Sequence, residues 1–314
     1  MRTKWRFAPL AACALWLAAA PAQAQSQAQS QAPDLGPHFR TVKEGVHVYA
    51  STPIQSNCTI ILTSDGVVLI DSGHNPPDSR AVMAAIRKLT ALPVRLLINT
   101  EPHADHTSGH FVFSPPAVVV AAAGAGDSMR RAHNPRRWEP QLASAPSAEA
   151  MRKALEGYRQ ITPHVEYRDR MTLSVGERTF ELHWLKNVHS EADTAIWMPK
   201  ERILFTAASV SVNRFNNLRP FVSIADTLAA IKMMRALNPE IVIAGHGPPG
   251  TVKILDDMER YYILLLERVR RLAEQGKSLD EIKAELKMPE YDHWVGKDRY
   301  PNNIEAAYRE VKGR

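Results

Sequence analysis

Two acidic side chains and two histidines fall within six consecutive residues, Glu101-Pro102-His103-Ala104-Asp105-His106. Neutral imidazole and carboxylate are the usual protein ligands of a hydrolytic Zn²⁺. The segment directly follows the apolar run Val94–Asn99, so we expect it to form a loop at a strand end, where side chains can converge. In so tight a loop His103 and His106 do not easily reach one metal, so we expect neighbouring ligands to serve two adjacent metals.

Two further histidines lie in similar settings. His189 stands between strand-like runs, in Asn-Val-His-Ser-Glu-Ala-Asp, and His246 follows another, in Ala-Gly-His-Gly-Pro-Pro. The glycines beside His246 let the backbone come close to a ligand. We therefore expect His189 and His246 to complete the ligand sets. His74 and His110 lie near these motifs and are expected to have supporting or surface roles.

Short β-rich runs and helical stretches alternate along most of the chain, which indicates an α/β protein with two sheets. Polar residues 126–165 are rich in Arg and Pro and are expected to form an insertion or a lid, helical near 147–160. Helices are expected at 79–90, 224–237 and 252–275, and a capping box at Ser278–Glu281 opens one more. The expected strands are Val46–Tyr49, Thr59–Thr63, Val67–Ile70, Val94–Asn99, Val118–Ala123, 171–175, 179–185, Ala195–Met198, Ile203–Thr206 and Glu240–Ala244.

The N-terminus has the pattern of a secretory signal peptide. Basic residues precede an apolar run, and Ala22-Gln23-Ala24 supplies a cleavage pattern of small residues. The run is short for a membrane anchor, so we expect cleavage after Ala24, a periplasmic or secreted protein and no stable membrane insertion. The expected organisation is a signal peptide at 1–24, a flexible linker at 25–36 and one domain at 37–314.

Charge and cysteine content exclude some classes of protein. Residues 1–24 hold three of the 39 basic residues and none of the 33 acidic ones, which leaves 36 − 33 = +3. This small charge, without a basic-aromatic patch, does not favour nucleic-acid binding. Loss of Cys13 with the signal leaves Cys58 alone, which excludes an intramolecular disulfide. Cys58 is expected to be a buried small apolar residue.

The order and spacing of these motifs resemble the metallo-β-lactamase-fold superfamily over residues 40–275. Its hallmarks are His-x-His-x-Asp-His, a later single His and a final Gly-His-Gly, and Asp71-Ser72-Gly73 matches its early Asp-x-Gly. The resemblance implies an αββα four-layer sandwich, to which this chain adds a C-terminal helical extension. Asp71 is expected to be a structural hydrogen-bonding residue near the site, not a ligand.

The resemblance also implies two Zn²⁺ sites and a metal-bound hydroxide as nucleophile. Asp105 would orient the nucleophile and help to protonate the leaving group. The first site would use Glu101, His103 and His189. The second site would use Asp105, His106 and His246.

Two positions depart from the family pattern. Glu101 replaces a histidine; a carboxylate is a competent ligand that adds negative charge, and the alternative is a supporting or exposed carboxylate. In residues 204–211 there is no carboxylate where many family members have an Asp that bridges the metals. The third subclass of metallo-β-lactamases also lacks this Asp and carries serines here. Ser209 and Ser211 are therefore expected to contact substrate.

Three functions remain open. The first is β-lactam hydrolysis, the second is hydrolysis of another ester, lactone, phosphoester or sulfate ester, and the third is binding of a metal or ligand without catalysis. All three imply a small-molecule ligand, while the sequence leaves the oligomeric state open. A basic cluster at Arg130, Arg131, Arg136 and Arg137 is interpreted as a solvated face, with attraction of anionic substrates as the alternative. Tyr261 and Tyr262 are expected to belong to a helix packing face, with an oligomer contact as the alternative.

Overall fold

The computed structural model describes residues 33–144, 146–186 and 188–313. The chain divides into two units, Met1–Asp34 and Leu35–Arg314, and the architecture below is that of the second unit. The predicted signal peptide, its cleavage after Ala24 and most of the predicted linker lie outside the described residues. Within the described part of the chain, no helix has the length and apolar character needed to span a membrane.

The first sheet contains seven strands in sequence order from β1 to β7. Strands β1 to β4 pair antiparallel, and β4 to β7 pair parallel. The hairpin predicted at Ser64-Asp65-Gly66 joins β3 and β4. Strands β1 and β7 were not predicted, because both are edge strands with exposed or partly exposed residues. The bounds are β1 Phe39–Lys43, β2 Val46–Tyr49, β3 Cys58–Thr63, β4 Gly66–Ile70, β5 Val94–Ile98, β6 Val118–Ala122 and β7 Val165–Tyr167.

The second sheet contains five strands in the order β12-β11-β10-β9-β8. Strands β11 and β12 pair parallel, and the other pairs are antiparallel. Two strands of this sheet flank predicted metal ligands, because β10 follows His189 and β12 precedes His246. The bounds are β8 Arg170–Val175, β9 Arg178–Leu185, β10 Asp193–Met198, β11 Ile203–Phe205 and β12 Ile241–Ile243.

The two sheets pack face to face, as strand β10 illustrates. All its residues are buried, because successive side chains of a strand point to opposite faces and both faces of β10 are covered. Ile196 and Met198 belong to the core between the sheets. Ala195 and Trp197 belong to the core between the second sheet and its helices.

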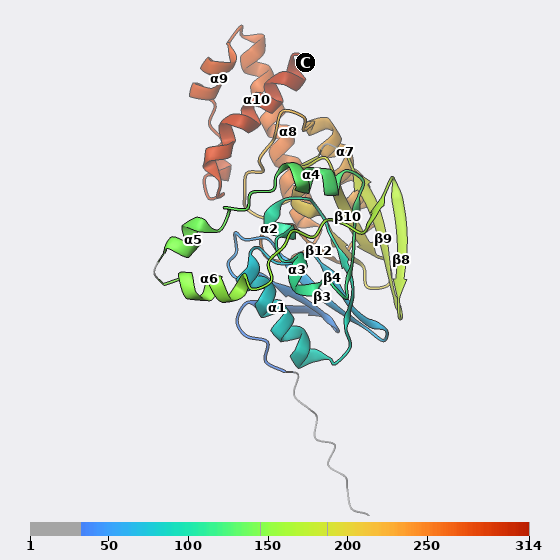
Figure 1. Ribbon diagram of the computed structural model, residues 1–314. Coiled ribbons are helices and arrows are strands. Elements are labelled where there is room, and N and C mark those ends of the chain that lie inside the picture. The colour runs from blue at the N-terminus through green and yellow to red at the C-terminus, as the bar shows by residue number, and fades with distance from the viewer. Residues whose placement is uncertain (1–32, 145, 187, 314) are drawn as a thin grey trace, which may run out of the picture. The chain divides into compact units, whose positions relative to one another are not determined.

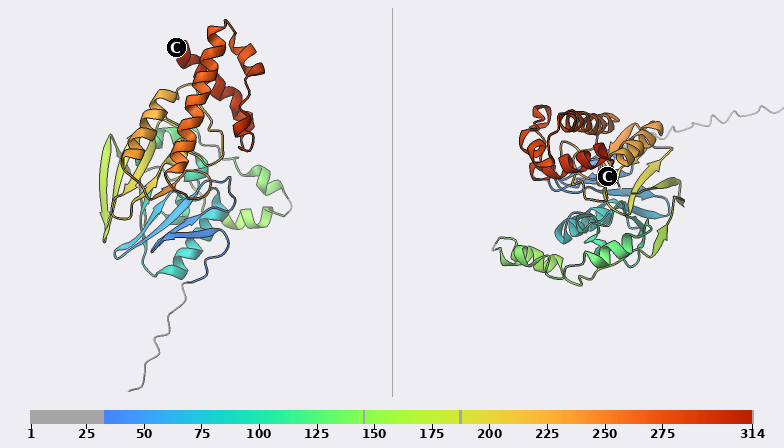
Figure 2. Two further views of the ribbon diagram at one scale, coloured as in Figure 1. Left: turned by 180° about the vertical axis from the view of Figure 1, so that it is seen from behind. Right: turned by 90° about the horizontal axis from the view of Figure 1, so that it is seen from above.

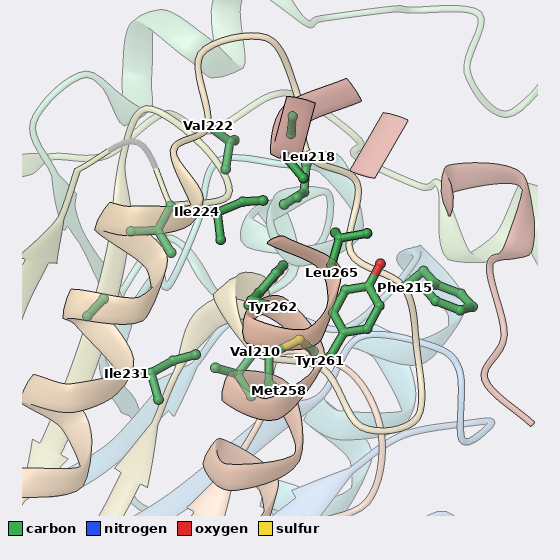
Figure 3. Close-up of a cluster of buried hydrophobic side chains, with 14 of the residues drawn as sticks. Val210, Phe215, Leu218, Val222, Ile224, Ile231, Met258, Tyr261, Tyr262 and Leu265 are labelled. Carbon is green, nitrogen blue, oxygen red and sulfur yellow. The ribbon is translucent and has the colours of Figure 1, made fainter. Parts of the chain in front are cut away.

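Helices cover both outer faces, which confirms the αββα sandwich (Figure 1). Helix α1, Pro76–Leu89, packs Val82 and Ile86 on the first sheet. Helices α7, Ile224–Ala236, and α8, Lys253–Glu274, cover the second sheet. Tyr261 and Tyr262 of α8 are fully buried in this core, which confirms the packing role (Figure 3). Cys58 is buried as predicted.

The predicted insertion and C-terminal extension are both helical. The capping box at Ser278 and Glu281 is confirmed. Figure 2 shows the C-terminal helices on one side of the sheets and the helices of the insertion on the other. The remaining helices are α2 Ala104–Thr107, α3 His110–Phe113, α4 Ala125–Arg131, α5 Glu139–Ala143, α6 Ala148–Ala154, α9 Leu279–Glu285 and α10 Tyr300–Val311. Short 3₁₀ helices are η1 Ala207–Ser209, η2 Pro289–Tyr291 and η3 Lys297–Arg299.

Candidate metal centre

Strand ends bring the predicted ligands together. Strand β5 ends at Ile98, and the chain then passes Glu101 and begins α2 with His103 as its N-cap residue. His189 precedes β10, and His246 follows β12. The ligand atoms of these segments lie close together in two groups. Three segments that are far apart in sequence therefore supply one site.

Glu101, His103 and His189 form a first group whose ligand atoms all lie within 4.8 Å of one another. Oε2 of Glu101 contacts Nδ1 of His103 and lies 3.3 Å from Nε2 of His189. Two hydrogen bonds fix the backbone of His189. Its N–H donates to Asp193, and its carbonyl oxygen accepts from Arg219. This group is the first ligand set implied by the family resemblance.

Glu101, His106 and His246 form a second group of the same kind. Oε1 of Glu101 lies 2.9 Å from Nε2 of His106. Asp105 also approaches this group, with Oδ2 at 3.7 Å from Nε2 of His106 and 3.5 Å from Nε2 of His246. The expected partners Asp105, His106 and His246 therefore lie together, but Glu101 joins them, which the sequence did not indicate.

Supporting contacts fix the direction of both imidazoles in the second group. Nδ1 of His106 lies 2.8 Å from Oδ2 of Asp71, and Nδ1 of His246 lies 3.2 Å from the carbonyl oxygen of Ile54. In each ring Nε2 is thereby left to face the site, which is how metal-binding histidines are commonly oriented. Asp71 is itself held by Asn99 and by the backbone and hydroxyl of Thr100. Asp71 thus has the supporting role expected for it.

The electrostatics of the site favour a charged Glu101. Burial by itself raises the pKa of this carboxyl, but the surrounding histidines, His106 foremost, lower it well below its usual value. For Asp105, burial again acts to raise the pKa, but His106, His246 and His74 together outweigh this effect and bring the pKa to about 2. Burial, aided by His106, lowers the pKa of His246 to about 3. Ionised carboxylates and neutral imidazoles are the forms that bind metal. Burial acts to lower the pKa of His106 as well, but Glu101, Asp71 and Asp105 together raise it well above its usual value, so a metal would bind there in place of a proton.

The site residues fit a bound cation. Oε1 of Glu101 and Nε2 of His106 are buried and 2.9 Å apart, yet neither makes a hydrogen bond. Unpaired buried polar atoms are costly, so native structures rarely retain them without a partner. A divalent metal held by Glu101 and His106 would supply that partner. Imidazole nitrogen with carboxylate oxygen is a donor set suited to Zn²⁺.

The segment that lacks the family's bridging carboxylate lies against the same site. Ala208 lines the cavity that contains the ligands. Gly245 packs so closely on this segment that an added Cβ would lie 2.5 Å from the backbone nitrogen of Ala208. The glycine before His246 is therefore required by backbone contact, and an alanine occupies the wall position.

The two predicted substrate serines differ in position. Ser211 lines the cavity, and its buried hydroxyl has no hydrogen-bond partner. The hydroxyl of Ser209 instead donates to the carbonyl oxygen of Thr206, and Ser209 is absent from the cavity wall. Ser209 thus stabilises the turn at η1, and a substrate contact by its side chain is not supported.

Sequence reasoning missed most of the cationic wall of the cavity. Arg214, Arg219 and Arg299 line it together with the ligands, and Arg137 joins them from the insertion. The predicted basic cluster has two different environments. Arg130, Arg131 and Arg136 form ion pairs with exposed carboxylates, and of the four arginines only Arg137 lines the cavity. Arg214 and Arg219 could have been predicted as cavity residues, because both follow shortly after Ser209 and Ser211 in the sequence.

Residues 51–246 match the Metallo-beta-lactamase superfamily. The fold and the metal-capable groups agree with this match, and the chain belongs to the metallo-β-lactamase superfamily, a family of metal-binding hydrolases.

Known relatives match this chain at low identity. The 2,4-dinitroanisole O-demethylase subunit alpha of Nocardioides sp. (strain JS1661) is 24% identical over 191 residues, or 60% of this chain and 52% of that protein. The stereoselective inverting sec-alkylsulfatase Pisa1 from Pseudomonas sp. superposes with a TM-score of 0.66 at 19% identity, over 87% of this chain and 50% of that one. A metallo-beta-lactamase from Pontibacter korlensis gives 0.56 at 19% identity, over 71% and 96%. The chain thus spans about half the length of the demethylase subunit and of the sulfatase.

Proposed function

We propose that this protein is an exported, zinc-dependent hydrolase that holds two metal ions and cleaves an ester-type or lactam bond in a small molecule. The observation that carries the proposal is the pair of ligand groups, each with two histidines, that share Glu101. Family membership supports hydrolysis.

In this proposal Glu101 is a ligand of both metals. Its Oε2 faces His103 and His189, while its Oε1 faces His106, so each carboxylate oxygen belongs to a different group. A carboxylate has two oxygens with which it can serve two cations at once. Glu101 would thereby take the place both of the usual histidine of the first site and of the bridging carboxylate that residues 204–211 lack.

The chain's own residues account for orientation and proton transfer. Bound zinc supplies Lewis acidity and lowers the pKa of a coordinated water towards neutrality. Asp105 faces His106 and His246 through Oδ2, so it could orient the attacking water and pass the proton of that water to the leaving group. In the overall reaction the oxygen of one water joins the electrophilic centre, the bond to the leaving group breaks, and that group leaves with a proton.

Two substrate classes are supported by different observations. β-Lactam hydrolysis is favoured by the similarity to the Pontibacter korlensis enzyme and by Ser211 in the cavity wall. Hydrolysis of another ester, including a sulfate ester, is favoured by the larger share of this chain, 87%, that superposes on the alkylsulfatase. Because fold does not determine substrate, the choice depends on the cavity residues.

The test combines metal analysis with a substrate panel. Purified protein loaded with zinc is assayed with a chromogenic cephalosporin, a 4-nitrophenyl ester, the matching sulfate and the matching phosphate. We expect about two zinc ions per chain and turnover of at least one substrate, which a chelator abolishes and added zinc restores. Full zinc loading without turnover of any substrate in the panel would instead support the non-catalytic alternative. In that case Asp105→Ala should leave the function of the protein unchanged.

Export is a separate part of the proposal and rests on residues 1–24 alone. Expression of the full chain in a bacterium should yield periplasmic protein whose first residue is Gln25. Cytoplasmic protein that retains Met1 would contradict export.

A further inference from the structure

The cavity that contains the metal ligands has a cationic wall. Arg137, Arg214, Arg219 and Arg299 line it. Among the described residues, no carboxylate forms an ion pair with Arg214 or Arg299. Arg214 donates to the carbonyl oxygen of Ile54, and Arg299 donates to that of Phe215. By contrast, the nearby surface arginine Arg130 pairs with Asp127. The cavity arginines therefore keep hydrogen-bonding capacity for a ligand.

Packing of the loop between η1 and α7 explains why Arg214 faces the cavity. Apolar residues along this loop anchor it in the core over α8, as Figure 3 shows for Val210, Phe215, Leu218 and Val222. Between these anchors, Ser211, Arg214 and Asn216 line the cavity. The guanidinium is thus placed by apolar burial of its neighbours.

Arg299 comes from the C-terminal extension, outside the residues 51–246 that match the family. The backbone of Val295 exchanges hydrogen bonds with the loop, donating to Asn213 at 2.9 Å and accepting from Phe215 at 3.0 Å. This pairing brings the following 3₁₀ helix η3, and with it Arg299, to the cavity. The extension therefore contributes a charged residue to the site.

Two groups in the cavity would gain from a bound anion. Burial, together with the like charge of Arg299, lowers the pKa of Arg214. The hydroxyl of Ser211 is buried, with the residue 3% exposed, and has no hydrogen-bond partner. An anion with several oxygens would relieve the repulsion and accept a hydrogen bond from this hydroxyl.

We propose that the substrate carries an anionic oxygen group, a carboxylate, sulfate or phosphate, that is bound by Arg214, Arg299 and Ser211. The inference rests on the proposed function, because it names the substrate class of the same site. Guanidinium groups bind such anions through paired hydrogen bonds, and partial burial strengthens the interaction. The anion is either the scissile ester itself or a carboxylate elsewhere on the substrate.

The first arm of the test compares substrates with one leaving group. The zinc-loaded protein is assayed with 4-nitrophenyl acetate, which is neutral, with 4-nitrophenyl hemisuccinate, which adds a remote carboxylate, and with 4-nitrophenyl sulfate and phosphate. For a remote anion, we expect kcat/KM to be at least about tenfold higher for the hemisuccinate than for the acetate, in line with the strength of charge-assisted hydrogen bonds. For a scissile anion, we expect turnover of the sulfate or the phosphate without such a gain for the hemisuccinate. Preference for hemisuccinate indicates a remote anion, and preference for the sulfate or phosphate a scissile one.

Arg299→Gln is the main variant, because Arg214 shares the carbonyl oxygen of Ile54 with His246 and its replacement can disturb a ligand. Arg299→Gln should lower kcat/KM for the preferred anionic substrate about 10–100-fold, whereas kcat/KM for 4-nitrophenyl acetate should change by less than about twofold. Arg214→Lys keeps the charge and should retain part of the preference. Arg270→Gln, at an exposed position on α8, is the matched control and should change neither value.

A binding measurement makes the two proposals separable. Affinity of the zinc-loaded protein for inorganic sulfate is measured by calorimetry, and Arg299→Gln should weaken it about tenfold or more while Arg270→Gln does not. If no substrate is turned over but sulfate binding depends on Arg299, the hydrolase proposal fails and the anion site stands. Equal losses on neutral and anionic substrates, with sulfate binding unchanged in Arg299→Gln, would overturn the anion site.

Discussion

Replacement of Glu101 by glutamine isolates the role of this residue in the metal centre. Glutamine keeps the size of the side chain but removes the charge and leaves a single oxygen. Because Oε1 and Oε2 of Glu101 face different ligand groups, Glu101→Gln should weaken both metal sites. Loss of a residue that only supports a ligand already lowers metal affinity 10–100-fold, so we expect each Kd to rise at least about tenfold, or about 1.4 kcal/mol per site.

Glu101→His provides the matching comparison. It restores the usual family residue, but a neutral imidazole has one free lone pair, so it can serve one metal only. We expect Glu101→His to bind about one zinc tightly and one weakly, whereas Glu101→Gln weakens both. Glu149→Gln, at an exposed position on α6, is the control for loss of a carboxylate and should bind zinc as the parent does.

Competition with a chromophoric chelator gives both Kd values without relying on activity. Magnetic coupling in the Mn²⁺-loaded protein, seen by electron paramagnetic resonance, provides a second readout, because a carboxylate that joins two ions transmits coupling. A rise of only one Kd in Glu101→Gln, with coupling unchanged, would refute the shared-ligand assignment.

Three further predictions concern the residues around the site. Asp71→Asn should weaken the second metal site about 10–100-fold, measured by the same chelator competition, because Asp71 orients His106. Burial lowers the pKa of His110 to about 4 from 6.5, so the unfolded chain binds the proton first as the pH falls. The folded state should lose up to about 3 kcal/mol between pH 6.5 and 4, and urea unfolding of His110→Gln should show a smaller loss. Gly245→Ala should lower the free energy of unfolding by about 1–3 kcal/mol or more, because its Cβ would meet the backbone of Ala208.

Each of these predictions has a contradicting result. Zinc affinity unchanged in Asp71→Asn would mean that His106 keeps its orientation unaided. An identical pH dependence in His110→Gln would assign the acid loss to other groups. Stability unchanged in Gly245→Ala would mean that the segment at Ala208 can move away at little cost.

Much of the fold was predictable because its signals are local. Strand β2 begins and ends where the apolar run does, and the capping box at Ser278 marks the start of α9. Strand β7 was missed because it has three residues, two of them exposed, and is recognised only by its pairing with β6. The N-terminal start of α1 at Pro76 also preceded the expected start at 79, because Asn75 caps the helix through its side chain.

The site was predictable in its residues and less so in its arrangement. His103, His189 and His246 each follow or precede a strand, which is visible in the sequence. The position of Glu101 between the two groups depends on how two sheets bring their ends together, which no local pattern encodes. Arg299 reaches the cavity through backbone pairing of Val295 with a loop about 80 residues earlier, so its role appears only in three dimensions.

The most direct test of the account measures metal content and turnover on one preparation. Zinc per chain is determined by mass spectrometry, and hydrolysis of the preferred 4-nitrophenyl substrate is followed before chelation, after it and after zinc is restored. The account predicts about two zinc ions per chain and turnover that falls and returns with them. Turnover that survives complete removal of metal would contradict it.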